Sequence, residues 1–157
     1  MERQIVVVTP GRERIEDRWV AEQFAVWGAV IVRSEADEHD EIMAVVQALR
    51  HFATFTFGRF LYQHRIDLKR TLEFSSPIYR LELDMVGRLF AQDPELYGEI
   101  IFATPERLEL LREYLESVKN NLDIISGHDL DDGSGREKFI REFNKIATWF
   151  GPFSDQA

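Results

Sequence analysis

Residues 39–63 read HDEIMAVVQALRHFATFTFGRFLYQ, with no proline and with Gly58 as the one glycine. This composition predicts a single long helix, because no residue in it removes a helical hydrogen bond. At about 100° per residue, one half of the helix collects mostly apolar side chains. They are Ile42, Val45, Val46, Leu49, Phe52, Ala53, Thr56, Phe57 and Phe60. This half is predicted to face the core.

The opposite face of this helix carries small and polar residues at spacings of three and four. They are Asp40, Ala44, Gln47, His51, Thr54, Gly58 and Tyr62. A face that met only water would carry Lys and Glu, so this one is expected to meet a neighbouring helix, a second subunit or a ligand. His51, with Gln47 one turn before it, is either a hydrogen-bonded structural residue or part of a ligand site.

The composition limits the class of protein. A chain of 157 residues with 45% hydrophobic content can form one domain with its own core. A net charge of −9 argues against nucleic acid or an anionic membrane as partner. The absence of cysteine excludes disulfides and a cysteine nucleophile, and it fits a reducing, cytoplasmic location. The four histidines form no ligand pair at helical spacing, so no metal site is expected.

The N-terminal region predicts a βαβ unit. Ile5–Val8 is a β-branched run typical of a buried parallel strand, and it is too short for a signal peptide or a membrane span. A helix over 16–27 and a second buried strand over 29–33 follow. Two strands make a marginal sheet, so it is expected either to be covered by helices or to continue in another chain, and residues 1–33 resemble the end of a larger α/β domain. Residues 34–157 are then a separate helical domain.

Helix starts are well marked after residue 34. Ser34, with Asp37 in the first turn, is expected to cap the long helix. An N-cap residue followed by proline occurs at Ser76-Pro77, Asp93-Pro94 and Thr104-Pro105, and predicts helices over 77–91, 94–103 and 105–126. A last helix is predicted over 136–150. The fold class is therefore mainly α, with five to six helices preceded by a short βαβ unit of two parallel strands.

The acidic loop at 128–135 is not expected to bind calcium, because its spacing places Ser134 and Ile140 where Gly and Glu are needed. Gly133-Ser-Gly135 begins a dinucleotide pattern, but Lys138 occupies the third glycine position. We therefore expect no metal and no cofactor on this chain.

The predicted helix from Pro77 carries Arg80, Asp84 and Arg88 at successive i,i+4 steps. They form either a surface salt-bridge ladder or, at Arg88 beside the bare backbone of Gly87, a receptor for a carboxylate. Arg88 together with His51 would suit a small dicarboxylic or aromatic acid. The core face of this helix is predicted to be Ile78, Leu81, Met85 and Leu89.

Several segments resemble the C-terminal part of prephenate dehydrogenases, in particular the form fused to chorismate mutase. The resemblance runs from about Ile5 to Gly151. It is carried by Glu38-His-Asp, QALRHFATF at 47–55, SSPIYRLEL at 75–83, MVGRLFAQDPELY at 85–97 and Trp149-Phe-Gly.

The resemblance implies a Rossmann-type domain that binds NAD or NADP, and a helical domain that forms an intertwined homodimer and completes the prephenate pocket. The reaction would be oxidative decarboxylation of prephenate to 4-hydroxyphenylpyruvate, in tyrosine biosynthesis. It further implies that Arg88 binds a substrate carboxylate and that His51 and Gln47 line the pocket. Tyr97 stands where the family often has an aromatic residue from the partner subunit, and His39 also matches a family position.

The resemblance implies that residues 1–33 are the end of the dinucleotide-binding domain, and that the family's glycine-rich fingerprint, mutase segment and catalytic histidine would all precede residue 1. We therefore expect no catalytic residue in this chain, and neither tight NAD binding nor prephenate oxidation by the chain alone. A homodimer is expected because so apolar a helix is hard to bury within one chain. The alternatives are a non-catalytic module that binds tyrosine or a related aromatic acid, and a chorismate mutase, whose basic residues find no match here.

Overall fold

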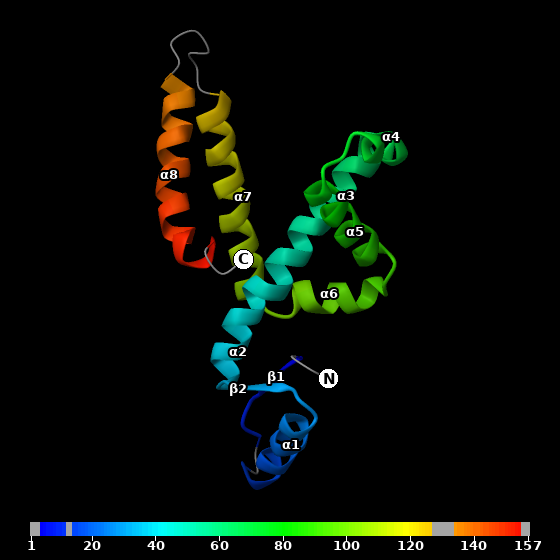
Figure 1. Ribbon diagram of the computed structural model, residues 1–157, viewed down its shortest axis with the longest axis vertical. Coiled ribbons are helices and arrows are strands. Elements are labelled where there is room, and N and C mark those ends of the chain that lie inside the picture. Colours follow the sequence, from blue (N-terminus) through cyan, green and yellow to red (C-terminus); the bar gives the residue numbers. More distant parts are fainter. Residues whose placement is uncertain (1–3, 12–13, 127–133, 155–157) are drawn as a thin grey trace. The chain divides into compact units, whose positions relative to one another are not determined.

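The computed structural model describes residues 4–11, 14–126 and 134–154, and it divides into two compact units, residues 1–108 and 109–157 (Figure 1). The first unit begins with β1 (Ile5–Val8), α1 (Arg14–Val26) and β2 (Val30–Arg33). The strands pair in parallel, from Ile5 with Val30 to Val8 with Arg33. Gly28 has a φ of 86°, which a residue without a Cβ adopts readily, and it turns the chain from α1 into β2. The predicted βαβ unit is confirmed.

The predicted burial of both strands is wrong for this chain. Ile5 is 69% exposed, and Val30 and Val32 are exposed as well. α1 packs against both strands, but a two-stranded sheet with one helix leaves much of its apolar surface open.

The long central helix is present as three consecutive pieces: α2 (Ala36–Met43), the π-helix η1 (Ala44–Leu49) and α3 (Arg50–Gln63). Their extent agrees with the predicted helix, whereas the π-helical segment was not predicted. The expected cap at Ser34 is wrong. Glu35 is the N-cap residue, without a side-chain bond, and the Ser34 hydroxyl donates to Glu38 Oε2 at 2.7 Å.

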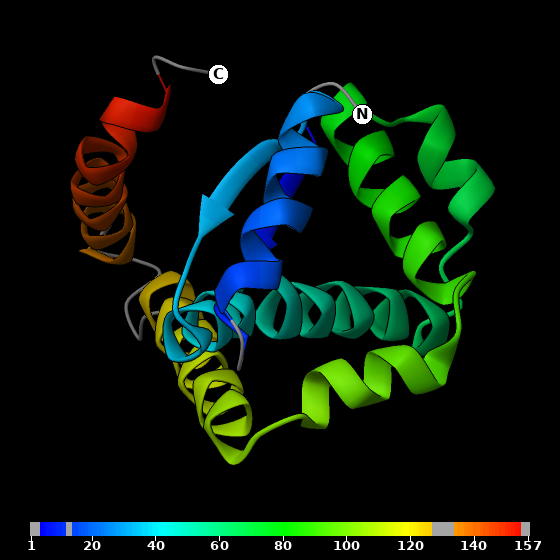
Figure 2. The ribbon, with the colours of Figure 1, turned by 90° about the horizontal axis from the view of Figure 1, so that it is seen from below.

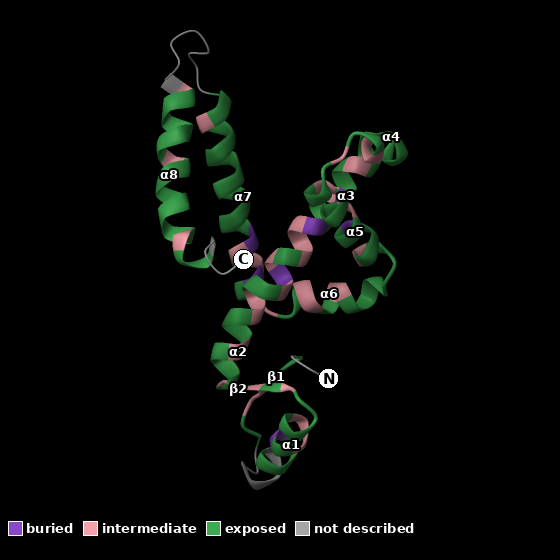
Figure 3. Ribbon diagram, in the orientation of Figure 1, coloured by how far each residue is buried: buried purple, intermediate pink, exposed green. Residues whose placement is uncertain are grey.

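The small and polar face of this helix meets a neighbouring helix, which is one of the predicted alternatives, whereas the prediction that the apolar half faces the core is wrong within one chain. The buried residues are Ala48, Thr54 and Gly58, of which the last two belong to the small and polar face (Figure 3). Residues of the apolar half are largely open to solvent, and Val46 is 56% exposed. The reason is that α5 packs against the small residues, where two helix backbones can approach closely.

The remaining helices of the first unit are α4 (Leu68–Glu73), α5 (Pro77–Phe90) and α6 (Pro94–Phe102). α4 was not predicted, and the side chain of Asp67 caps it by accepting the N–H of Arg70. The predicted caps at Ser76 and Asp93 are confirmed, because they accept the N–H groups of Tyr79 and Glu95. α3 runs between α5 on one side and α6 on the other (Figure 2).

The contact between α3 and α5 depends on Gly58. A Cβ at this position would lie 2.8 Å from Val86 Cγ1 and would also collide with the ring of Phe90. The face of α5 predicted to be its core is instead exposed, and Ile78 reaches 79%. The residues of α5 that face α3 are instead Val86 and Phe90, which lie about 40° apart around the helix.

α7 (Pro105–Ser126) starts where Thr104-Pro105 predicted, and its buried Arg107 donates to the backbone oxygen of Ile100. The second unit contains the rest of α7 and α8 (Ser134–Ser154), which is longer than predicted. The predicted loop at 128–135 lies mostly outside the described residues. Most large apolar side chains of α8 are exposed, among them Phe143 and Ile146. No helix in the described parts of the chain is long and apolar enough to cross a membrane.

Candidate functional site

His51 and Tyr97 form an aromatic pair between α3 and α6. Their ring centroids lie 4.7 Å apart with an interplanar angle of 85°, an edge-to-face arrangement. The hydroxyl of Tyr97 donates to Gln92 Oε1 at 2.9 Å. Asp93 caps the start of α6 one turn before Tyr97, and this cap fixes the direction in which Tyr97 leaves the helix. Two residues predicted for the site are thus in contact within one chain.

The surroundings of His51 disfavour its protonation. Partial burial, followed by the positive charge of Arg50, lowers the pKa of His51 below its usual 6.5. Arg50 is held in place because its Nη1 donates to Thr54 Oγ1 at 2.8 Å, while the Thr54 hydroxyl donates to the backbone oxygen of Arg50 at 3.0 Å. Thr54 is only 6% exposed. A neutral imidazole therefore stands beside a fixed guanidinium.

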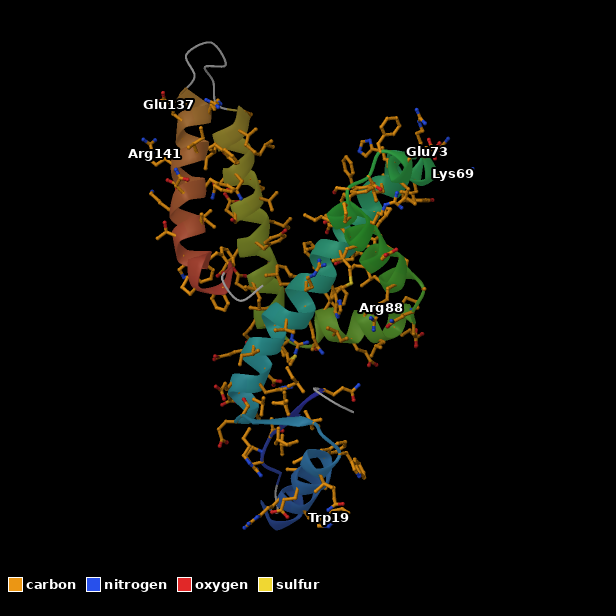
Figure 4. All side chains as sticks on the ribbon, in the orientation of Figure 1. Trp19, Lys69, Glu73, Arg88, Glu137 and Arg141 are labelled. Atoms are coloured by element: carbon orange, nitrogen blue, oxygen red, sulfur yellow. The ribbon has the colours of Figure 1, made fainter. Side chains whose placement is uncertain are left out.

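Arg88 lies in the last turn of α5, near the point where the chain turns into α6 (Figure 4). It lies about 200° around the helix from Val86 and from Phe90, so it points away from α3. Among the described residues it has neither a hydrogen bond nor an ion pair, and no recorded contact joins it to His51 or Tyr97. Its link to the aromatic pair runs along the chain, through Gln92 in the following turn.

The salt-bridge ladder, one of the two alternatives for this helix, does not form among the described residues. Arg80 Nη2 donates to the backbone oxygen of Leu72 at 2.7 Å, at the end of α4, and no ion pair joins Arg80, Asp84 and Arg88 in the part of the chain that is described. The close approach inferred at Gly87 is also missing within one chain, since a Cβ there would meet nothing within 4 Å.

Gln47 lies in η1, which packs against α6, and it is half-buried. In a π-helix the hydrogen bonds join residues five apart, so the wider turn displaces Gln47 from the line through His51 that i,i+4 spacing predicted. No hydrogen bond joins Gln47 to His51 among the described side chains. His39 lies on α2, where its Nδ1 is 3.1 Å from Asp40 Oδ1.

A groove of about 1080 Å³ opens between α3, α4 and α5. Its lining is mainly apolar, with Leu61, Leu72, Val86 and Phe90 among the residues, and Asp84 is its one carboxylate. The groove contains none of the four predicted binding residues His51, Arg88, Gln47 and Tyr97. Its chemistry is that of a surface covered by other apolar side chains.

Two polar residues of the site were missed by sequence reasoning. Arg50 was overlooked, although its i,i+4 spacing to Thr54 could have indicated the bond between their side chains. Gln92 lies in a turn five residues before Tyr97, and no periodicity in the sequence indicates that they would meet.

The described residues do not fit a metal or a dinucleotide. They contain no group of three or more side chains that could hold a metal ion. The sequence after β1 reads Thr9-Pro10-Gly11-Arg-Glu13, without the second and third glycines that let a backbone approach a pyrophosphate.

Comparison with known proteins gives a consistent family. Residues 35–145 match the family model described as "Prephenate dehydrogenase, dimerization domain". The chain is 44% identical over 149 residues to the T-protein of Enterobacter agglomerans and 43% identical over 156 residues to the T-protein of Haemophilus influenzae. It is 30% identical over 152 residues to a probable arogenate/prephenate dehydrogenase of Methanocaldococcus jannaschii.

These alignments cover 95%, 99% and 95% of the chain, but only 38%, 40% and 33% of the respective relatives. The chain thus spans about two fifths or less of the proteins that it matches. The matched family extends over α2 to most of α8 and includes both His51 and Tyr97. From this match and these identities, the chain belongs to the prephenate dehydrogenase dimerization-domain family.

Proposed function

We propose that this chain is the dimerisation and substrate-binding part of a prephenate dehydrogenase, and that it binds prephenate through His51, Tyr97, Gln47 and Arg88. The observation that carries the proposal is the edge-to-face pair of His51 and Tyr97, which brings together two residues predicted for the pocket from separate helices. The name of the relative from Methanocaldococcus jannaschii supports the substrate class.

The chemistry of the pair suits a ring acid. An aromatic edge and a neutral imidazole offer a surface for a six-membered ring, and His51 remains uncharged at neutral pH because its pKa is lowered. Arg88 has a free guanidinium fork, which can bind a carboxylate with two parallel hydrogen bonds. Within one chain Arg88 points away from α3, so in this proposal its side chain has to turn towards the α5–α6 connection, where Gln92 accepts from Tyr97, to reach the same ligand.

Hydride transfer to NAD or NADP belongs, in this proposal, to a dinucleotide-binding domain outside these 157 residues. The residues of this chain bind and orient the ring acid, and they supply no group that transfers hydride. The 157-residue chain mixed with prephenate and NAD should therefore give no rise in nicotinamide absorbance. A steady rise would contradict this division of roles.

A homodimer is the second half of the proposal. Helices α3, α5 and α8 leave many large apolar side chains exposed, and an apolar groove opens between α3, α4 and α5, as is typical of surfaces that bind another protein. A second copy that covered these surfaces would give the domain the core that a single chain lacks.

Calorimetric titration of the 157-residue chain with prephenate tests the binding role. We expect saturable binding that is weakened about tenfold or more by Arg88→Ala, because a charge-assisted bidentate pair is lost. Arg18→Ala, at an exposed position of α1, is the control and should leave binding unchanged. Retention of tyrosine but not prephenate would favour the non-catalytic module that binds an aromatic amino acid, and binding of neither would reject the proposal.

A further inference from the structure

We propose that Arg50 binds a ligand carboxylate beside the His51–Tyr97 pair, so that the site selects a ring acid with two carboxylates over one with a single carboxylate. The inference rests on the proposed function and adds to it a residue that determines specificity. Arg88 would receive one carboxylate and Arg50 the other.

The position of Arg50 follows from helix geometry. At about 100° per residue, Thr54 lies between Arg50 and His51 around the axis of α3, at about 40° from the first and 60° from the second. The bond from Arg50 Nη1 to Thr54 Oγ1, at 2.8 Å, draws the guanidinium towards this shared side. The charge of Arg50 is close enough to His51 to lower the pKa of its imidazole, which agrees with this position.

Arg50 is held before any ligand arrives. Thr54 is buried, and its hydroxyl both accepts from Arg50 Nη1 and donates to the backbone oxygen of Arg50. Long side chains normally lose much rotamer freedom when they bind a ligand, and a guanidinium fixed in advance loses less. The rest of its fork remains open, because Arg50 itself is exposed.

No carboxylate among the described residues forms an ion pair with Arg50. In the described parts of the chain, ion pairs engage Arg18, Arg70, Arg112, Lys119 and Lys145, each with a glutamate three or four residues away. Arg50 has no such partner, in a chain with 28 acidic residues and a net charge of −9. A cation held beside a candidate site and left without a counter-ion is suited to an anionic ligand.

Selection by the number of carboxylates would distinguish the substrate from the product of the proposed reaction. Prephenate carries two carboxylates, whereas 4-hydroxyphenylpyruvate, the product of its oxidative decarboxylation, carries one. A receptor for the second carboxylate would bind substrate and release product. Arg88 alone would hold both compounds by the carboxylate that they share.

The test compares the dissociation constants of prephenate and 4-hydroxyphenylpyruvate, measured by calorimetry on the 157-residue chain and its variants. Arg50→Gln should weaken prephenate binding about tenfold and leave 4-hydroxyphenylpyruvate within about twofold. Arg50→Lys keeps the charge without the fork and should restore part of the difference. Thr54→Val keeps Arg50 but frees its side chain, and should weaken prephenate alone by a smaller factor. Arg18→Gln, at an exposed position of α1, is the control for the loss of an arginine charge.

Equal weakening of both ligands by Arg50→Gln, or no weakening of either, would overturn the inference while leaving prephenate binding by the chain intact. Failure of the unsubstituted chain to bind prephenate would instead reject the proposed function, and the inference with it. If Arg50→Gln loses its helical circular dichroism, Thr54→Val decides: a prephenate affinity equal to that of the unsubstituted chain would overturn the inference.

Discussion

His51 combines two effects that act in the same direction. Burial against Tyr97 and the charge of Arg50 both disfavour the imidazolium, and burial is the larger effect. The neutral ring is the form that can lie against an aromatic edge without losing the hydration of a charge. The pKa of His51 therefore depends on the contact between α3 and α6, and sequence spacing alone does not predict that contact.

Replacement of Tyr97 by alanine should raise the pKa of His51 towards 6.5, because it uncovers the imidazole. Proton NMR titration of the histidine ring measures this directly. Tyr62→Ala, at an exposed position of α3, the helix that carries His51, should leave the titration of His51 unchanged. A His51 pKa unaffected by Tyr97→Ala would show that the pair does not form in solution.

The same lowered pKa has a consequence for stability. The folded chain binds its proton on His51 less readily than the unfolded chain, whose histidine titrates near 6.5. Above pH 6.5 His51 is neutral in both the folded and the unfolded chain, and its contribution to the free energy of unfolding is complete. As the pH falls from 6.5 through the lower pKa of the folded state, the unfolded chain takes up the proton first, so this contribution is lost. Urea denaturation at several pH values should show this loss in the unsubstituted chain and a smaller one in Tyr97→Ala.

Gly58 sets the distance between α3 and α5. Gly58→Ala places a methyl group against the stiff, buried Val86, and should lower the free energy of unfolding by about 1–3 kcal/mol as in other overpacked sites. The matched control is Gly98→Ala in α6, where an added Cβ meets nothing within 4 Å. There the higher helix propensity of alanine should stabilise the chain by up to about 1 kcal/mol. Stabilisation by Gly58→Ala would contradict the close packing.

At the scale of the helices, sequence reasoning succeeded where the signal is local. Ser76-Pro77, Asp93-Pro94 and Thr104-Pro105 each mark a helix start, because a side-chain cap and a fixed proline φ act within one turn. It failed where the outcome depends on neighbours. α4 begins with the side-chain cap of Asp67 but lacks the proline that marks the other starts, and η1 has no local signal in the sequence. The exposure of the apolar half of α3 depends on which other segments cover it.

The cap of α6 links local structure to the candidate site. Asp93→Ala removes the acceptor for the N–H of Glu95 and should cost about 1 kcal/mol of stability, whereas Asp93→Asn should cost only a few tenths. Because α6 carries Tyr97, the alanine variant should also weaken prephenate binding, and the asparagine variant should not. Thermal denaturation and calorimetry give the two readings; an alanine variant as stable as the unsubstituted chain would contradict the assigned cap.

At the scale of the whole molecule, burial also depends on which other segments pack against a helix, and this explains why the predicted core faces are exposed. The faces of the central helix and of α5 that were predicted to be core are exposed within one chain. Apolar periodicity identifies which face will be covered, but it cannot say whether the cover comes from the same chain or from another. The family to which the chain belongs is named for dimerisation, which agrees with cover from another copy.

A charge on the outward apolar face of the central helix should therefore prevent association. Val46→Glu replaces an exposed apolar side chain in η1, and burial of its carboxylate in a dimer interface would be strongly unfavourable. We expect this variant to sediment as a monomer at micromolar concentration. Ala25→Glu, an equal change of charge at an exposed position of α1, should retain the mass of the unsubstituted chain.

The mass of the unsubstituted 157-residue chain in solution tests the central claim most directly, because that claim is that a second copy covers the exposed apolar faces. Light scattering at micromolar concentration should give twice the chain mass of 18.4 kDa. A mass of 18.4 kDa across the micromolar range would mean that the chain covers its apolar faces by itself, and would contradict the account.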